Sequence, residues 1–230
     1  MKIVTWNCNG ALRKKYEALE EFDADLLIVQ ECEDPAQSPK RYAEWAGDYL
    51  WTGGSKNKGI GVFAKNGTSI ETLDWPDGEL QQFLPCCIND QFNLLAVWTM
   101  HSSTFQYIGQ FWKYLQLNKE RIAVTDTVIC GDFNSNVCWD KKNRHWNHCD
   151  VVRELGELDI HSMYHELFGE NQGEESKPTL FMQRKLNRPY HIDYTFMSKA
   201  LMDGGSIEVG SPARWLELSD HMPIMFSVVV

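Results

Sequence analysis

The chain has 230 residues, of which 43% are hydrophobic, 12% aromatic and 23% charged, so its composition excludes a disordered chain and a coiled coil. Its formal net charge of −10 argues against a protein that holds long nucleic acid by electrostatics alone, because that mode of binding needs a basic surface. We expect one domain over residues 1–230, since the length suits a single domain and no linker or repeat interrupts it.

The start of the chain runs straight into a strand-like alternation, and no segment has the length and apolar character of a signal peptide or a transmembrane helix. The seven cysteines are an odd number without regular spacing, which predicts free thiols in a reducing compartment. We therefore expect a cytoplasmic protein that does not contact a membrane. Nothing in the sequence indicates an obligate protein partner.

The first half of the chain predicts a strand, a helix and then a series of strands. Strand patterns at 2–6 and 25–30 flank a helical stretch at 13–22, where Leu12, Tyr16 and Leu19 fall near helical spacing. Four more strand patterns follow, joined by turn-rich segments, at 60–64, 68–73, 81–88 and 92–100. This succession predicts antiparallel pairing beside the strand–helix–strand opening, so the sheet must be mixed.

The second half contains the longest helical stretch, at 105–122, with Ile108, Phe111 and Leu115 near one face. It leads into a short apolar strand at 127–130, and a second helix is predicted at 149–158. Strand patterns follow at 179–183, 192–197, 206–209 and 224–230. Many strands and few helices predict an α+β fold, an α/β sandwich in which two mixed β-sheets pack face to face and are flanked by helices.

The segment Gly131-Asp132-Phe133-Asn134-Ser135-Asn136 directly follows the strand at 127–130. A carboxylate and two carboxamides at the end of a buried strand are costly to bury unpaired, so they either cap a turn or bind a ligand. Because Asp, Asn, Ser and Gly are also ordinary turn residues, this segment alone does not decide between the two.

Polar clusters also adjoin five other apolar runs. They are Asn7-Cys8-Asn9-Gly10, Gln30-Glu31, His101, Asp193-Tyr194 and Ser219-Asp220-His221. Any one of them reads more readily as a cap, a turn or a satisfied buried hydrogen bond. Six such clusters at strand ends together favour a single site at one mouth of the sandwich.

The side chains in these clusters suit phosphate ester hydrolysis. The carboxylates are Glu31, Asp132, Asp193 and Asp220, the amides are Asn7, Asn9 and Asn134, and the histidines are His101 and His221. Carboxylates act as metal ligands or bases, and histidines transfer protons or donate to anions. Oxygen-dominated ligation without cysteine favours Mg²⁺ or Mn²⁺ over Zn²⁺, and such an ion polarises a phosphoryl group.

The ordered set of motifs resembles the endonuclease/exonuclease/phosphatase family, Mg²⁺-dependent phosphoesterases that include exonuclease III and deoxyribonuclease I. The matching stretches are TWNCNG at 5–10, QE at 30–31, GDFNSN at 131–136, HIDY at 191–194 and SDH at 219–221. They occur in the family's order and span nearly the whole chain. The resemblance implies a deoxyribonuclease I-like fold and a Mg²⁺ cofactor, with Mn²⁺ as a substitute.

The resemblance also implies how a metal would be held. Asn7 and Glu31 would bind the ion, and Asp220 would lie at it, directly or through water. Asn9 stands where some members of the family have Asp. A neutral amide at this position would weaken the metal site or change the number of ions bound.

The remaining motif residues take catalytic roles by the same resemblance. Asp132 would orient or deprotonate the attacking water, and Asn134 would place that water or stabilise the phosphorane. Asp193 would fix the tautomer of His221, which would donate to a phosphoryl oxygen. His101 would contact the scissile phosphate.

Basic residues outside the motifs favour a polyanionic substrate. The segment 138–146 interleaves Trp139 with Lys141 and Arg144, as a loop that stacks bases and binds phosphates would. An exposed basic loop with its tryptophans packed in the core is an equally weighted alternative. Arg184 and Arg188 precede HIDY and are predicted to reach the site, and Lys56 with Lys58 forms a further basic group.

Two other motifs have weaker functional interpretations. A Zn²⁺ site made by Cys138, His145, His148 and Cys149 fits no common ligand spacing. The glycine-rich stretch 53–59 lacks the strand-to-helix context of a P-loop and is predicted to be a flexible hairpin.

These observations lead to a Mg²⁺-dependent phosphodiesterase, most simply a DNA endonuclease or exonuclease that works by in-line attack of an activated water. The alternative is a phosphatase or phosphodiesterase that acts on small phosphoesters, which the acidic surface would suit, or on RNA. A non-catalytic binding module is disfavoured, because a pure binder does not need Asp132, Asp193 and His221 together.

Overall fold

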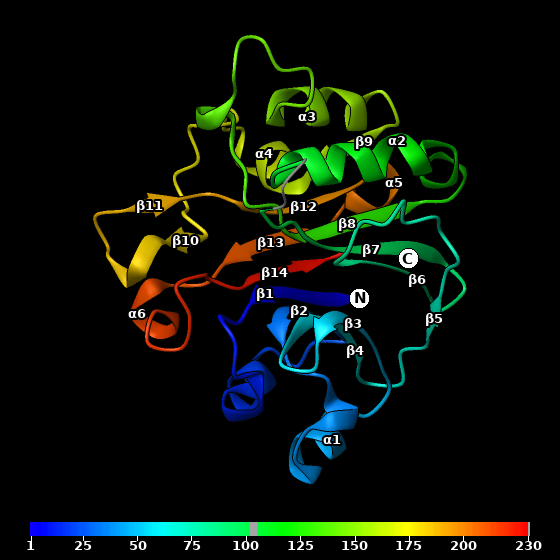
Figure 1. The fold of residues 1–230 in the computed structure, drawn as a ribbon, viewed down its shortest axis with the longest axis vertical. Coiled ribbons are helices and arrows are strands. Elements are labelled where there is room, and N and C mark those ends of the chain that lie inside the picture. The colour runs from blue at the N-terminus through cyan, green and yellow to red at the C-terminus, as the bar shows by residue number, and fades with distance from the viewer. Residues whose placement is uncertain (102–104, 230) are drawn as a thin grey trace.

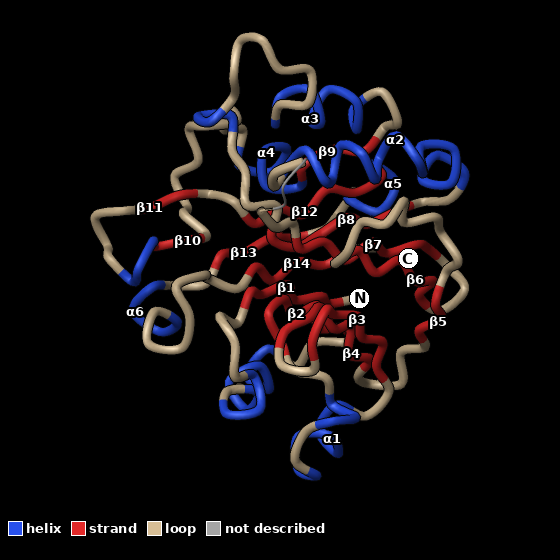
Figure 2. Tube along the Cα trace, viewed as in Figure 1, coloured by secondary structure: helices blue, strands red, loops and turns tan. Residues whose placement is uncertain are grey.

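The computed structural model of the chain describes residues 1–101 and 105–229. In these residues, two six-stranded mixed sheets stack face to face at the centre and helices cover both outer faces (Figure 1, Figure 2). The predicted fold class, two mixed sheets flanked by helices, is thereby confirmed.

The first sheet has the order β13-β14-β1-β2-β4-β3. Its strands are β1 (Lys2–Asn7), β2 (Leu26–Cys32), β3 (Tyr49–Ser55), β4 (Lys58–Ala64), β13 (Ser206–Val209) and β14 (Ile224–Ser227). β1 pairs parallel with β2 and antiparallel with β14. The carboxyl ends of β1 and β2 therefore lie at the same edge of the sheet.

The second sheet has the order β5-β6-β7-β8-β12-β9. Its strands are β5 (Ile70–Thr72), β6 (Phe83–Ile88), β7 (Phe92–Trp98), β8 (Thr127–Asp132), β9 (Ile160–Ser162) and β12 (Asp193–Ser198). β7 and β8 are parallel, whereas β12 runs antiparallel to β8.

Helices α2 (Ile108–Val124) and α3 (His148–Gly156) cover the second sheet, and α1 (Lys40–Ala46) lies on the far side of the first (Figure 1). The shorter helices are α4 (Met163–Phe168), α5 (Lys199–Met202) and α6 (Pro212–Trp215). The hairpin β10 (Leu180–Phe181) and β11 (Pro189–Tyr190) lies with α6 at one side of the sandwich, at the left in Figure 1. Within the described ranges, no helix is both long and apolar enough to cross a membrane.

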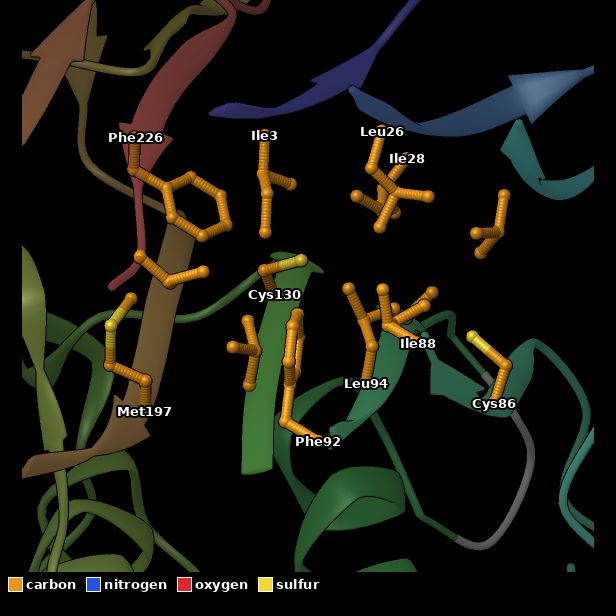
Figure 3. Packing of buried hydrophobic residues seen from close by; sticks show 14 of the residues in the cluster. Ile3, Leu26, Ile28, Cys86, Ile88, Phe92, Leu94, Cys130, Met197 and Phe226 are labelled. Carbon is orange, nitrogen blue, oxygen red and sulfur yellow. The ribbon is translucent and has the colours of Figure 1, made fainter. Parts of the chain in front are cut away.

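The main hydrophobic core lies between the two sheets. Ile3, Leu26 and Ile28 of the first sheet face Leu94 and Cys130 of the second, all fully buried (Figure 3). Separate apolar clusters pack helices α2 and α3 onto the second sheet and the N-terminal 3₁₀ turns and α1 onto the first. Because β1, β2, β7 and β8 are buried on both faces, they read in the sequence as near-continuous apolar runs.

Several element boundaries differ from the sequence prediction. The stretch 13–22 forms two 3₁₀ helices, Leu12–Lys14 and Tyr16–Phe22, because Lys15 between them is non-helical with φ −133°. The helix predicted from residue 105 begins at Ile108, since Tyr107 has a left-handed φ of 51°. The strand predicted at 179–183 ends at Phe181, and the stretch 53–59 belongs to the β3–β4 hairpin.

Candidate active site

The candidate site lies where strand ends from both sheets meet. β1 and β8 contact each other across the sandwich, and Asn7 and Asp132 are their last residues. β12 begins with Asp193, which pairs with Asp132 in the antiparallel register. His221 precedes β14, which runs antiparallel to β1. The topology therefore brings four of the sequence-predicted residues to one edge.

Strand β8 approaches β7 so closely just before the site that residue 131 has to be glycine. Gly131 has φ +140°, and a Cβ atom there would lie 1.9 Å from the carbonyl oxygen of Val97. Val97 and Gly131 are register partners. A side chain at residue 131 would force the strands apart and displace Asp132.

Asp132 is 1% exposed and is held by three hydrogen bonds. Its Oδ1 accepts the backbone N–H of Asn134 at 2.9 Å. Its Oδ2 accepts the side-chain amides of Asn7 and Asn134, each at 2.8 Å. Burial and the neighbouring Asp193 carboxylate raise the pKa of Asp132 to about 7, against the opposing effects of His221 and these donors. A carboxylate with such a pKa can accept a proton near neutrality.

His221 and Asp193 form a buried ion pair. The Nδ1 atom of His221 lies 2.9 Å from Oδ2 and 3.1 Å from Oδ1 of Asp193. Burial alone would lower the pKa of His221, but the charges of Asp193 and Asp132 and the hydrogen bond raise it to about 10. His221 is therefore charged at neutral pH, with Nδ1–H directed at Asp193.

One ligand atom from each of Asp132, Asp193 and His221 lies within 4.8 Å of the other two, so these side chains form one buried cluster. Two carboxylates with one imidazolium leave a negative balance in a buried place. The arrangement combines a base of near-neutral pKa with a charged donor, as general acid–base chemistry on an anion requires.

Asn7 joins this cluster to Glu31. The amide nitrogen of Asn7 lies 2.8 Å from Oδ2 of Asp132 and 3.4 Å from Oε1 of Glu31. Its oxygen accepts the backbone N–H of Asn9 at 2.9 Å. In this arrangement the amide of Asn7 bridges the carboxylates of Asp132 and Glu31.

Glu31 occupies a strained position. It has a left-handed φ of 61° at an irregularity of the β2–β4 pairing between Gln30 and Cys32. Non-glycine residues adopt this conformation at a cost and chiefly where function or packing requires it. Its Oε2 lies 2.6 Å from the ammonium of Lys58, so the carboxylate already holds one cation.

Asn9 and Asp220 lie at the outer rim of the site, where the amide of Asn9 donates to Oδ1 of Asp220 at 2.7 Å. His101 is exposed, bridges to Gln106 and contacts the ring of Tyr107. In the described parts of the chain, His101 makes no hydrogen bond or ion pair with Asp132, Asp193 or His221. His101 is therefore an exposed residue, two positions after Thr99, whose carbonyl accepts the amide of Asn134.

The donor set fits a divalent cation with hard oxygen preference. The Asn7 amide joins the carboxylates of Glu31 and Asp132, and Asp220 offers a third carboxylate at the rim, where it accepts the amide of Asn9. The ammonium of Lys58 on Glu31 shows that this carboxylate attracts positive charge.

A cavity of about 350 Å³ opens beside Asn134. Trp139, Lys141 and Arg144 line it, as does Tyr107. Trp139 is 40% exposed and packs against Tyr190 at 5.2 Å between ring centroids, so it is not a core residue. Trp146, in contrast, packs against the cluster under α2 and α3. The loop therefore divides its aromatic residues between the cavity and the core.

Arg184 and Arg188 lie on the exposed connection between β10 and β11 and do not line this cavity. The guanidinium of Arg184 donates to the carbonyl oxygens of Glu217 and Leu218. Arg188 donates to Oε1 of Gln183. Met182, which belongs to the same connection, lines the cavity, so Arg184 and Arg188 lie on the side of the molecule that carries it.

The weaker Zn²⁺ alternative does not assemble. Cys138 and Cys149 are exposed, and the buried ring of His148 contacts Ser135 Oγ and Gln172 Oε1. Among the described residues, Asp132, Asp193 and His221 form the group of His, Cys, Asp or Glu side chains that is close enough to share an ion.

Several residues of the site were not singled out from the sequence. Ser219 Oγ donates to the Asn7 carbonyl and accepts the N–H of His221, which fixes the chain before the histidine. Thr179 Oγ1 accepts the N–H of Asp193. Ser219 was visible in the SDH motif, whereas Thr179 and Tyr107 had no sequence signal because their roles depend on long-range contacts.

Comparisons with known proteins agree with this geometry. The Endonuclease/Exonuclease/phosphatase family model matches residues 4–221. No curated protein matches the sequence. Similar solved structures include a 3′-5′ exonuclease, NExo, from Neisseria meningitidis (19% identity, TM-score 0.73) and an AP endonuclease from Archaeoglobus fulgidus (18%, 0.73). A 3′ phosphatase NExo variant from Neisseria bound to a product DNA hairpin has 18% identity and a TM-score of 0.72. Each match covers 100% of both chains.

Proposed function

This chain belongs to the Endonuclease/Exonuclease/phosphatase family, and we propose that it is a Mg²⁺-dependent phosphodiesterase that hydrolyses DNA. The family fixes the class of reaction, hydrolysis of a phosphoester bond. The observation that carries the site assignment is the buried cluster in which Asp132 stands beside the Asp193–His221 pair.

The chain's own residues supply most of the proposed mechanism. Asp132 orients the attacking water and accepts its proton at a carboxylate oxygen, since burial raises its pKa toward neutrality. Asn134 holds Asp132 in place through its amide and lines the cavity beside it. The charged His221 donates from Nε2 to a phosphoryl oxygen, because Nδ1 is committed to Asp193.

Glu31 and Asn7 are the proposed ligands of the divalent ion, with Asp220 at the rim of the site. When bound, Mg²⁺ polarises the phosphoryl group and offsets the charge of the displacement. Mn²⁺ should replace it, since both ions prefer oxygen ligands.

DNA is favoured by the cavity beside Asn134. Trp139 offers an exposed ring for a base, and Lys141 and Arg144 offer charges for adjacent phosphates. The likeness in fold to a phosphatase bound to a DNA hairpin supports the same substrate class. Asn9 and the exposed Arg188 are proposed as outer substrate contacts, and His101 as a contact of the scissile phosphate. Arg184 is a less favoured substrate contact, because its guanidinium already donates to two carbonyl oxygens.

Small phosphoesters and RNA remain the second candidate substrates. The net charge of −10 favours the small phosphoesters among these, because a negative protein repels any long polyanion. The single domain and the cytoplasmic location expected from the sequence stay predictions.

The test is to assay purified protein with Mg²⁺, with Mn²⁺ and with a chelator against duplex DNA, single-stranded DNA, RNA and a small phosphodiester. We expect cleavage of DNA that requires the ion. If no polynucleotide is cut under any metal condition while the small phosphodiester is hydrolysed, the second candidate replaces the first.

A further inference from the structure

Lys58 is a residue in contact with Glu31 whose role the proposed mechanism does not use. Its ammonium lies 2.6 Å from Glu31 Oε2, and the side chains are 53% and 18% exposed respectively. The ammonium also lies 5.7 Å from the ring centroid of Trp98, the register partner of Asp132. Lys58 thus reaches the site from the first sheet.

The backbone that carries Lys58 is rigid, although its side chain is not. Ser55 and Lys58 close the β3–β4 hairpin, and a Cβ atom at Gly59 would lie 2.3 Å from the Trp51 ring. The N–H of Asp34 donates to the carbonyl of Lys56, which ties the hairpin to the loop after β2. The chain therefore holds the Lys58 Cα beside Glu31, while four rotatable methylenes let the ammonium change partners.

Glu31 cannot serve two cations equally well. A divalent ion on this carboxylate would repel an ammonium bound to the same group at close range, where charges are only partly screened. The half-exposed Lys58 can leave Glu31 at modest cost, because exposed ion pairs contribute little. In a loaded site the strongest new anion within reach of this ammonium is the substrate phosphate.

We propose that Lys58 is a substrate-binding residue: its ammonium neutralises Glu31 in the metal-free protein and pairs with a phosphate oxygen of the substrate once a divalent cation occupies Glu31. This inference rests on the proposed function and adds an exchange of partners at the same site. Lys58 would then lower metal affinity in the absence of substrate and raise substrate affinity in its presence.

The first measurement is binding of Mn²⁺ alone, without DNA, followed by electron paramagnetic resonance. Lys58→Met should bind Mn²⁺ about three- to tenfold more tightly than the wild type, because the competing ammonium is gone. Lys58→Arg, which keeps the charge, should stay near the wild type. Lys56→Met is the matched control, since it removes an exposed charge from the same hairpin without touching Glu31.

The second measurement is DNA cleavage at saturating Mn²⁺. Lys58→Met should raise KM about three- to tenfold with little change in kcat, and the slope of log(kcat/KM) against log salt should fall by about one. Lys56→Met should leave KM and slope near the wild-type values. A KM unchanged in Lys58→Met would overturn the phosphate contact.

Glu31→Gln separates failure of this inference from failure of the proposed function. If Glu31→Gln weakens Mn²⁺ binding while Lys58→Met leaves it unchanged, the partner exchange is wrong and the metal site stands. If Glu31→Gln binds Mn²⁺ as the wild type does, Glu31 is not the metal ligand, and both this inference and that part of the proposed function fall.

Discussion

The Nδ1 atom of His221 lies 2.9 Å from Oδ2 of Asp193, and both side chains are buried next to Asp132. The pairing holds one imidazole proton toward Asp193 and keeps the ring charged at neutral pH. It leaves Nε2 as the nitrogen that can meet a substrate.

Asp193→Asn should lower kcat by about two orders of magnitude or more, because His221 loses both its orientation and its charge. The folded-state pKa of His221 is raised to about 10, so the activity that needs the charged ring is present below this value and lost above it. Removing the carboxylate lowers that pKa, and the alkaline limb of the pH–rate profile should move to lower pH. An unmoved limb would show that the pair does not control the reaction.

The double variant Asp193→Asn with His221→Asn should be scarcely slower than either single variant, since the two side chains act as a unit. Steady-state kcat for the four proteins measures this coupling. Fully additive losses would mean that the two residues serve separate purposes.

Trp139→Ala should weaken binding of single-stranded DNA by about 1–3 kcal/mol for each base that stacks on the ring. The exposure of Trp139 at the cavity is the reason, because a core tryptophan would instead cost stability. Fluorescence titration with the oligonucleotide gives the affinity. Leu167→Ala, an exposed apolar residue on α4, is the control and should bind as the wild type does; equal losses in both variants would exclude a specific stacking contact.

Lys141→Gln should reduce affinity for DNA of any sequence and lower the salt slope of binding by about one, as loss of a single phosphate contact does. Lys40→Gln removes an equivalent charge from α1, where Lys40 pairs with Glu44 far from the cavity. The two variants are compared by titration across a salt series. The assignment fails if their slopes change alike.

His148 should make stability fall in mild acid. Burial lowers its pKa from 6.5 to about 4, against the opposing charge of Asp140, so the folded protein holds the ring neutral. In the unfolded chain His148 becomes protonated below pH 6.5, whereas in the folded chain it stays neutral down to about pH 4. The free energy of unfolding should therefore fall by about 3 kcal/mol as the pH decreases across this window.

Urea unfolding of the wild type and of His148→Gln between pH 4 and 7.5 measures this contribution. The variant is expected to be less stable at neutral pH, since it loses the contact with Ser135, but its stability should depend less on pH. Parallel curves for the two proteins would contradict a neutral buried His148.

Much of the fold could be predicted because its central strands are buried on both faces. Strands such as β7 and β8 therefore appear as apolar runs, and the residues after them stand out as polar. The predicted helix boundaries were wrong where the backbone angles of one residue interrupt or delay a helix, as at Lys15 and Tyr107. Nothing in the local sequence requires the conformations of these two residues.

The sequence predicted those site residues that both belong to a motif and contact one another in the fold, as Asp132, Asp193 and His221 do. The site was not foreseeable where a contact depends on how distant segments meet. Lys58 appeared only as part of a basic group, and its contact with Glu31 depends on the β2–β4 pairing. His101, chosen from its place after a strand, is exposed because the chain turns outward after the buried Thr99.

Asp132, as the group that activates the attacking water, is central to the proposed mechanism. The most direct test is the single-turnover rate of DNA cleavage at saturating Mg²⁺ by the wild type and by Asp132→Asn, with urea unfolding to show that the variant is folded. We expect the variant to cleave about two or more orders of magnitude more slowly, while still binding DNA. A folded Asp132→Asn protein that cleaves DNA at the wild-type rate would contradict the account.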